Sequence, residues 1–180
     1  KDKRPVLMGI EEILDGYIDH QIDVVTRASL YDLNKANERL HIVDGLIKAI
    51  SILDDVVKIA KEVRKNAYVP YSHYYVGAAL VCKNGKVYSG CNIENDGIMS
   101  ICAERVAFTK AISEGERDFD YIVVCSGPEL DSLGDCSPCG YCRQFMHEFV
   151  DENFKIYLLD GNDEAHVYHI DDLLPHSFKL

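Results

Sequence analysis

Hydrophobic and polar residues follow two rhythms along this chain, and the rhythm changes near Pro70. The span between Pro5 and Pro70 contains no other proline. Within it, apolar residues recur at alternating steps of three and four, at Leu33, Ala36, Leu40, Val43, Ile47 and Ile50. This spacing predicts the seam of a coiled coil or of a tightly packed helical hairpin. A similar period upstream slips between Ala28 and Leu33, so we expect one long helix with a stutter, or two helices, followed by a helix over about 53–66.

After Pro70 the pattern predicts short strands. Residues 76–82 and 87–91 are expected to form a hairpin, because Asn84-Gly85 suits a type I′ turn. Two further apolar runs, 121–126 and 155–160, are typical of buried strands.

Two helices are expected between these strands. One covers 102–115 and ends at a glycine. The other is predicted to begin at Ser137-Pro138, as N-cap and first helical position, and to run to about residue 152. The resulting order of elements favours an α/β fold, in which helices flank a sheet.

The composition of the chain restricts the kinds of molecule that it is expected to bind. The chain has 180 residues, of which 47% are hydrophobic and 27% charged, as is typical of globular proteins. The net charge of −11 argues against direct nucleic-acid binding, which relies on Lys and Arg, and suits a small neutral or weakly cationic substrate. No apolar run approaches the roughly 20 residues of a membrane-spanning helix, and no signal-peptide pattern is visible. We expect no membrane association and a cytoplasmic location.

Three of the seven cysteines fall in two compact clusters, ICAERVAF with Cys102 and PCGYCRQF with Cys139 and Cys142. Without a secretory signal, such clustering indicates metal binding or reactivity rather than disulfides. All three residues lie near predicted helix starts, where the helix dipole favours thiolates. Three thiolates on zinc leave one position open for water, which is typical of a catalytic site. Glu104, two residues after Cys102, is placed to move protons there.

Cys-Ala-Glu followed by Pro-Cys-x-x-Cys is the zinc signature of the cytidine deaminases. The chain resembles the short, usually homotetrameric members of this family in five ordered blocks: NAYVPYSHYYVGAALV, NGKVYSGCNIEN, ICAERVAFTKAISEG, CSPCGYCRQF and LLPHSF. The resemblance covers about residues 53–180. It implies a three-layer α/β/α sandwich, a bound Zn²⁺, a nucleoside substrate and a homotetramer.

The resemblance also implies roles for individual residues. Cys102, Cys139 and Cys142 would bind the zinc ion. Glu104 would take a proton from the attacking water, pass it to N3 of the pyrimidine and later protonate the departing ammonia. Arg105 would hydrogen-bond the thiolates and offset their excess negative charge.

Four further positions match the substrate-binding residues of the family. Asn92 and Glu94 would bind the ribose, Tyr74 would lie against the pyrimidine, and the backbone N–H of Ala103 would meet the ring carbonyl. Simpler roles stay open: a turn for Asn92, a solvated charge for Glu94, and a core or interface position for Tyr74.

One loop departs from the family pattern. Residues 96–101, from Asp96 to Ile101, form a segment that is one residue shorter than usual and lacks its aromatic residue. In the family this loop lines the base pocket and reaches a neighbouring subunit. We hypothesise that Asp96 favours a modified or cationic pyrimidine.

The N-terminal part has a different resemblance. Residues 4–55 are similar to the segment of the topoisomerase IV A subunit that begins its coiled-coil arm, through VVTR, YDLNKA and LHIVDGLIKAI. The match includes no winged-helix domain with its catalytic tyrosine, so strand passage is not expected. A natural fusion, a rearranged remnant and an engineered joining would all explain it. We expect a helical arm over 1–52 and a catalytic domain over 53–180, with the arm adding an oligomer contact through its apolar stripe.

Three functions follow from these observations. The first is zinc-dependent hydrolytic deamination of cytidine or deoxycytidine in pyrimidine salvage. The second is deamination of another aminopyrimidine or of a pyrimidine antibiotic, motivated by the altered loop. The third is a non-catalytic binding module linked to a topoisomerase arm, in which Cys136 completes a closed, four-cysteine structural zinc site.

Overall fold

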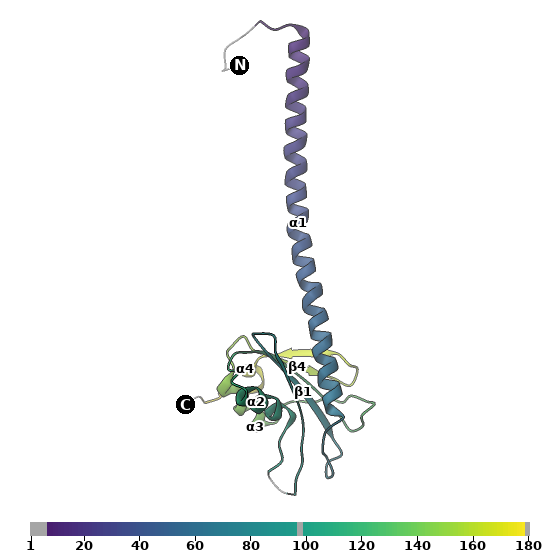
Figure 1. The fold of residues 1–180 in the computed structure, drawn as a ribbon, viewed down its shortest axis with the longest axis vertical. Helices are drawn as coiled ribbons and strands as arrows, with labels where there is room; N and C mark the ends of the chain where they lie inside the picture. Colours follow the sequence, from purple (N-terminus) through teal and green to yellow (C-terminus); the bar gives the residue numbers. More distant parts are fainter. Residues whose placement is uncertain (1–6, 97–98, 179–180) are drawn as a thin grey trace. The chain divides into compact units, whose positions relative to one another are not determined.

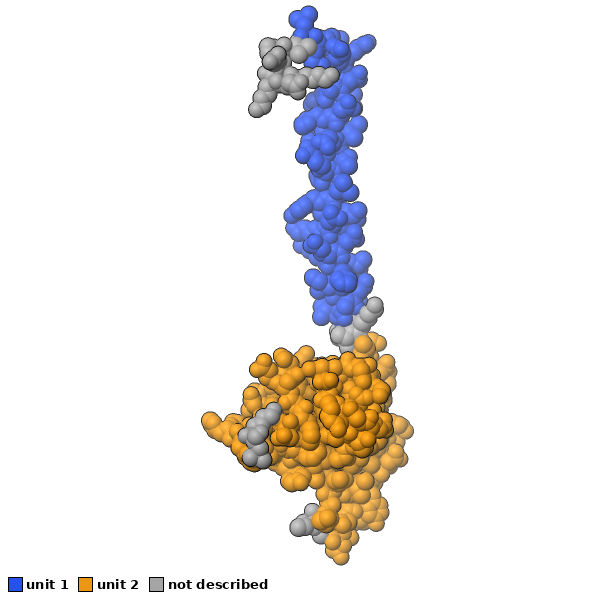
Figure 2. All heavy atoms as spheres, turned by 60° about the vertical axis from the view of Figure 1, so that its left-hand side comes forward, with its two compact units in different colours: residues 1–50 blue, residues 51–180 orange. Residues whose placement is uncertain are grey.

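The computed structural model describes residues 7–96 and 99–178 (Figure 1), and within helix α1 it leaves the side chains of 48–50 undescribed. The chain divides into two compact units, residues 1–50 and residues 51–180 (Figure 2). The division falls inside helix α1 (Ile10–Arg64). The boundary expected from the sequence, between 52 and 53, stays a prediction.

The first unit is helical. Helix α1 has no break over its range, so the expectation of one long helix is confirmed and the alternative of two helices is wrong. The separate helix expected over about 53–66 is also wrong, because these residues continue α1 to Arg64. All side chains described from Ile10 to Ile47 are exposed, including those of the predicted seam up to Ile47. The side chain of Ile50, the last residue of the seam, lies outside the described ones. Charged residues recur along α1, and no described helix combines the length and apolarity that crossing a bilayer requires.

The second unit contains a mixed sheet with the strand order β2-β1-β3-β4-β5. Its strands are β1 (Tyr75–Cys82), β2 (Val87–Cys91), β3 (Phe119–Gly127), β4 (Lys155–Leu159) and β5 (Ala165–Tyr168). β1 pairs antiparallel with β2 and β3, β3 pairs parallel with β4, and β4 pairs antiparallel with β5. The four strands expected from the sequence are confirmed. β5 was missed because this edge strand is largely exposed and has no buried apolar run.

Helices cover both faces of this sheet (Figure 1). In β1, Ala78 and Leu80 face α2 (Ala103–Ser113) and α3 (Gly140–Phe149), in a core centred on Phe108. Ala79 and Val81 face the opposite way and pack against residues 51–64 of α1. The predicted three-layer α/β/α sandwich is confirmed. A short helix, α4 (Ile170–Leu173), follows β5.

Two local predictions are wrong. Gly85 has a φ of +85°, but Asn84 is not in the left-handed region, so the hairpin turn is not type I′. The Gly85 N–H instead donates to the carbonyl of Cys82 (2.8 Å), and the left-handed glycine completes the turn. Helix α3 begins at Gly140 rather than at Pro138, and it ends at Phe149 rather than near 152 because Val150 is extended. The Ser137 hydroxyl does not cap α3; it accepts a hydrogen bond from Arg143 Nη2 (2.8 Å).

Arg64, the last residue of α1, is a buried cation that fixes a loop. Its side chain is 2% exposed. Its Nη2 lies 2.7–2.8 Å from the backbone carbonyls of Glu129, Leu130 and Ser132. Because a buried charge is costly unless it is hydrogen-bonded, these contacts tie the loop after β3 to the end of α1. The same loop continues into residues 135–137, which line the cavity described below.

We expect Arg64→Met to lower the free energy of unfolding by at least about 2 kcal/mol, because hydrogen bonds from a buried charged group are lost and carbonyls are left unpaired. Urea unfolding at fixed zinc and protein concentrations measures the change. Lys65→Met is the matched control, since Lys65 is exposed and pairs only with the exposed Glu62. Equal unfolding midpoints for the two variants would show that Arg64 does not hold the loop.

Candidate active site and metal centre

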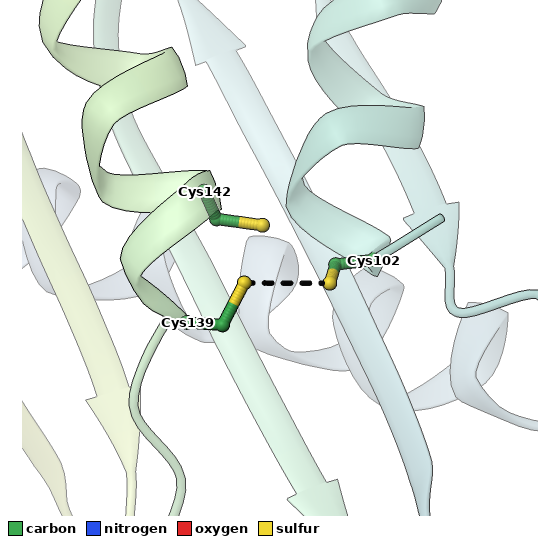
Figure 3. Close-up of side chains that lie close together, drawn as sticks. All are labelled: Cys102, Cys139 and Cys142. Carbon is green, nitrogen blue, oxygen red and sulfur yellow. Dashed lines mark hydrogen bonds between the residues drawn. The ribbon is translucent and has the colours of Figure 1, made fainter. Parts of the chain in front are cut away.

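Three cysteines converge where two helices begin. Cys102 is the N-cap residue of α2, Cys139 is the N-cap residue of α3, and Cys142 lies in the first turn of α3. Their sulfur atoms point toward one another (Figure 3). All three Sγ atoms lie within 4.8 Å of one another, and those of Cys102 and Cys139 are 3.7 Å apart. The cluster predicted from the sequence is thus assembled from two segments that are far apart in the chain.

This cluster fits a zinc ion. With Zn–S bonds of about 2.3 Å, two thiolates in a tetrahedral arrangement lie about 3.8 Å apart. The Cys102–Cys139 separation of 3.7 Å agrees with that spacing. Three sulfur donors, one buried and two partly or fully exposed, supply a set that zinc prefers and leave one tetrahedral position without a protein ligand.

The close approach of α2 to the sheet depends on Gly90 in β2. A Cβ atom at this position would lie 2.5 Å from the carbonyl oxygen of Ala103 and 2.6 Å from the backbone N of Ala107. Neither backbone atom can move without shifting the helix. Gly90 therefore lets the first turn of α2, with Cys102 and Glu104, lie directly on the sheet.

The thiol groups of Cys102 and Cys142 differ in pKa. A hydrogen bond with Cys142, followed by contacts with Arg105 and Cys139, lowers the pKa of Cys102 to about 5. The same hydrogen bond, together with burial, raises the pKa of Cys142. Cys102 therefore loses its proton more readily than Cys142 does. A metal ion that binds all three sulfurs must displace such protons.

Arg105 lies beside the cluster as expected. Its Nη2 is 3.6 Å from Cys102 Sγ and 3.2 Å from the carbonyl oxygen of Ser100. The guanidinium is therefore placed to compensate thiolate charge.

Glu104 is buried, with 4% of its surface exposed. Burial, with a further contribution from the Cys102 thiolate, raises the pKa of this carboxyl group to about 7. A carboxyl group whose pKa lies near neutrality can both accept and donate a proton, which is the property that general acid–base catalysis needs.

A cavity of about 340 Å³ joins most of the predicted site residues. It is lined by Tyr74, Val76, Asn92, Cys102, Glu104, Val124, Asp135, Cys136, Ser137 and Cys139. Metal ligands, a buried carboxyl group and an aromatic side chain thus face one space. A small polar ring suits it better than a polymer does.

The side chains of Asn92 and Glu94 make hydrogen bonds with the backbone of nearby loops, besides any contact with a ligand. The Asn92 side chain donates to the carbonyl of Tyr74 (2.8 Å) and accepts from the N–H of Val76 (2.8 Å). Glu94 accepts hydrogen bonds from the N–H groups of Tyr71 and Ser72, at 3.0 and 3.1 Å. Asn92 lines the 340 Å³ cavity, whereas Glu94 lines a neighbouring cavity of about 300 Å³. Their ribose-binding roles stay predictions.

Glu94 shares the neighbouring cavity with the altered loop, since Tyr71, Asn95, Asp96 and Ser100 also line it. Gly97 and Ile98 of that loop lie outside the described residues. The suggested effect of Asp96 on substrate choice stays a prediction.

Tyr74 is held in place by its hydroxyl group. Its Oη lies 3.0 Å from Ser126 Oγ and donates to the carbonyl of Asp135 at 3.1 Å. This fixes the ring as one wall of the cavity. Ala103 is the first residue of α2, so its N–H has no partner within the helix. The contacts of Tyr74 and Ala103 with a substrate ring stay predictions.

A closed four-cysteine site is not formed. Cys136 is not part of the metal-binding cluster found among the described residues; its Sγ instead lies 3.9 Å from the carbonyl oxygen of Val124. Asp160, Glu164 and His166 make a second group of close donors, but Asp160 already accepts hydrogen bonds from the N–H groups of the β4–β5 turn and contacts His166.

Sequence reasoning missed several cavity residues. Val76, Val124, Asp135 and Ser137 line the cavity but were not predicted as site residues. Ser137 adjoins the zinc motif and could have been found by that proximity. Asp135 and Val124 carry no such signal. Asp135 reaches the site through the folding of the loop after β3, and Val124 reaches it through the position of β3 in the sheet.

Comparisons with known proteins give two separate matches. The family model described as "Cytidine and deoxycytidylate deaminase zinc-binding region" matches residues 51–158. The family model for the A subunit of DNA gyrase and topoisomerase IV matches residues 1–70. The two matches overlap over the end of α1.

Individual relatives follow the same division. A cytidine deaminase from Sporosarcina psychrophila is 41% identical over 128 residues, covering 71% of this chain and 91% of the relative. The crystal structure of a cytidine deaminase from Burkholderia pseudomallei has 38% identity and a TM-score of 0.64, covering 69% of this chain and 98% of that one. The A subunit of DNA topoisomerase 4 from Staphylococcus epidermidis is 53% identical over 58 residues, which are 32% of this chain but only 7% of that protein.

We expect one zinc ion per chain in the wild type and in Cys136→Ser, and a loss of most zinc in Cys139→Ser. The reason is that Cys139 belongs to the three-sulfur cluster and Cys136 does not. Elemental analysis after dialysis against a weak chelator measures the content. Retention of zinc by Cys139→Ser together with its loss from Cys136→Ser would show that the ligand set is assigned wrongly.

Proposed function

The chain belongs to the cytidine and deoxycytidylate deaminase family, and from that premise we propose that it removes the amino group of cytidine or deoxycytidine by hydrolysis. The products are uridine or deoxyuridine and ammonia. The observation that carries the proposal is the placement of buried Glu104 in the same cavity as Cys102 and Cys139. A metal site with a closed ligand set would have no use for an adjoining cavity of this kind.

Cys102, Cys139 and Cys142 would hold the zinc ion, which would supply Lewis acidity that lowers the pKa of water and so provides a nucleophile at neutral pH. The protein moves the protons. Glu104 accepts a proton from the attacking water and delivers it to N3 of the pyrimidine while the hydroxide adds to C4, which becomes tetrahedral. Glu104 then takes the proton of the new C4 hydroxyl group and delivers it to the amino nitrogen. The C4–N4 bond breaks as the C4 carbonyl forms, and ammonia leaves. Burial of Glu104 supports both steps, because its pKa is raised toward neutrality.

The other residues orient the ring. The N–H of Ala103 at the start of α2, which has no partner within the helix, would donate to the C2 carbonyl oxygen, and the helix dipole favours negative charge there. Tyr74 forms an aromatic wall, and Asn92 fixes that wall through the backbone on either side of Tyr75. Glu94 in the neighbouring cavity would accept hydrogen bonds from ribose hydroxyl groups.

A role in pyrimidine salvage, in the cytoplasm, is part of the proposal. Reducing conditions suit a site that needs three free thiols. The described chain has seven free cysteines. A homotetramer is proposed on the basis of the resemblance to the short deaminases.

Glu104→Gln is expected to lower kcat for cytidine by about 10²–10⁴-fold, because the amide cannot transfer protons, while zinc content stays unchanged. Ammonia release and the ultraviolet change from cytidine to uridine measure turnover. Glu152→Gln, a change at an exposed residue after α3, is the control. Turnover by Glu104→Gln within tenfold of the wild type would rule out this acid–base role, and no turnover by zinc-loaded wild type would rule out the substrate.

We also propose that the exposed seam of α1 adds a contact between subunits. Two apolar seams that pack together remove surface from water, which an isolated helix cannot do. Leu33, Leu40 and Ile47 of this seam are 54%, 57% and 59% exposed within the chain.

Deletion of residues 1–50 should lower the oligomer mass measured by light scattering but preserve deaminase activity, since residues 51–180 contain the sheet and the site, and the match to a deaminase relative covers 91% of that relative. In the full chain, Leu40→Asp should have the same effect on mass because it puts a charge on the seam. Asn34→Asp, off the seam, is the matched control. An unchanged mass in the deletion and in Leu40→Asp would count against an arm contact.

A further inference from the structure

We propose that Tyr141 is a positioning residue that holds the Arg105 guanidinium against the zinc-binding thiolates. The inference rests on the proposed function for its kinetic consequence, but its structural part concerns only the metal centre. Tyr141 lies between Cys139 and Cys142, and Arg105 lies three residues after Cys102. The two side chains therefore connect the two helices that supply the ligands.

The geometry is that of a cation–π contact. The guanidinium carbon of Arg105 lies 4.5 Å from the centre of the Tyr141 ring. The Nη2 atom of the same guanidinium lies 3.6 Å from Cys102 Sγ and 3.2 Å from the carbonyl oxygen of Ser100. The Nε of Arg105 is buried and has no hydrogen-bond partner among the described residues. Two modest hydrogen bonds and one ring thus hold the cation.

The ring has a larger effect here than at an open surface. Cation–π attraction grows as the cation is desolvated, and Arg105 is only partly exposed. Tyr141 itself is 67% exposed, so its side chain contributes little to the packing of the core. The Tyr141 ring affects the site through its contact with Arg105.

The charge of the metal centre gives this contact a consequence. Three thiolates and one Zn²⁺ carry a net charge of −1, and a cation 3.6 Å from one sulfur offsets it strongly because Coulomb energy falls with distance. Without the ring, the guanidinium can turn toward solvent. The thiolates then donate more charge to the metal, which makes the metal a weaker Lewis acid.

The experiment compares Tyr141→Leu, Tyr141→Phe and Arg105→Gln with the wild type after loading with Co²⁺. A cation beside a thiolate stabilises its donor electrons, so losing that cation should move the sulfur-to-cobalt charge-transfer band to longer wavelength. Tyr141→Leu should shift the band in the same direction as Arg105→Gln. Tyr141→Phe should keep the wild-type band, because the ring and its π face remain. The band requires no turnover, so it tests the proposal even if cytidine is not the substrate.

Kinetics of the zinc-loaded chains supply the second readout. Tyr141→Leu should lower kcat by about 2- to 30-fold and leave KM within twofold, since Tyr141 does not line the substrate cavity; Tyr141→Phe should restore kcat. In an Arg105→Gln background, Tyr141→Leu should have no further effect on the band or on kcat. A wild-type band in Tyr141→Leu, or an undiminished effect in that background, would overturn the proposal.

Discussion

The convergence of two helix N-termini on one face of the sheet is the constraint on which the site depends. Helix α2 can approach β2 only because Gly90 has no side chain, and α3 packs beside it through the core around Phe108. Cys102 and Cys139 then meet as N-cap residues, where unpaired N–H groups and helix dipoles favour thiolates. The packing of α2 and α3 on the sheet thus also brings the metal-binding cysteines together.

Electrostatics divides the work among neighbouring residues. The cluster stabilises a thiolate on Cys102, and the same local negative charge, added to burial, raises the pKa of Glu104. One environment therefore produces both a metal ligand that is ionised and a carboxyl group that can carry a proton. Arg105, held by Tyr141, limits how far the negative charge extends.

The two units have different physical bases for stability. Residues 51–180 bury a core on both faces of the sheet. The helix in residues 10–47 exposes its apolar seam, so in isolation it gains little from packing. The similarity of this segment to topoisomerase subunits covers only 7–8% of those proteins.

The sequence by itself determined the elements whose signal is local. Helical period, apolar strands and cysteine spacing predicted α1, the first four strands, the two ligand-bearing helices and the zinc ligands with Glu104. The sequence predictions were wrong at the turn at Asn84 and at the start of α3, and they missed the exposed strand β5, which has no buried apolar pattern. Only the tertiary structure decided that Cys136 stays out of the cluster, that Asp135 and Val124 line the cavity, and that Tyr141 lies on Arg105. These depend on distances between segments far apart in the chain, which packing sets and which no local spacing encodes.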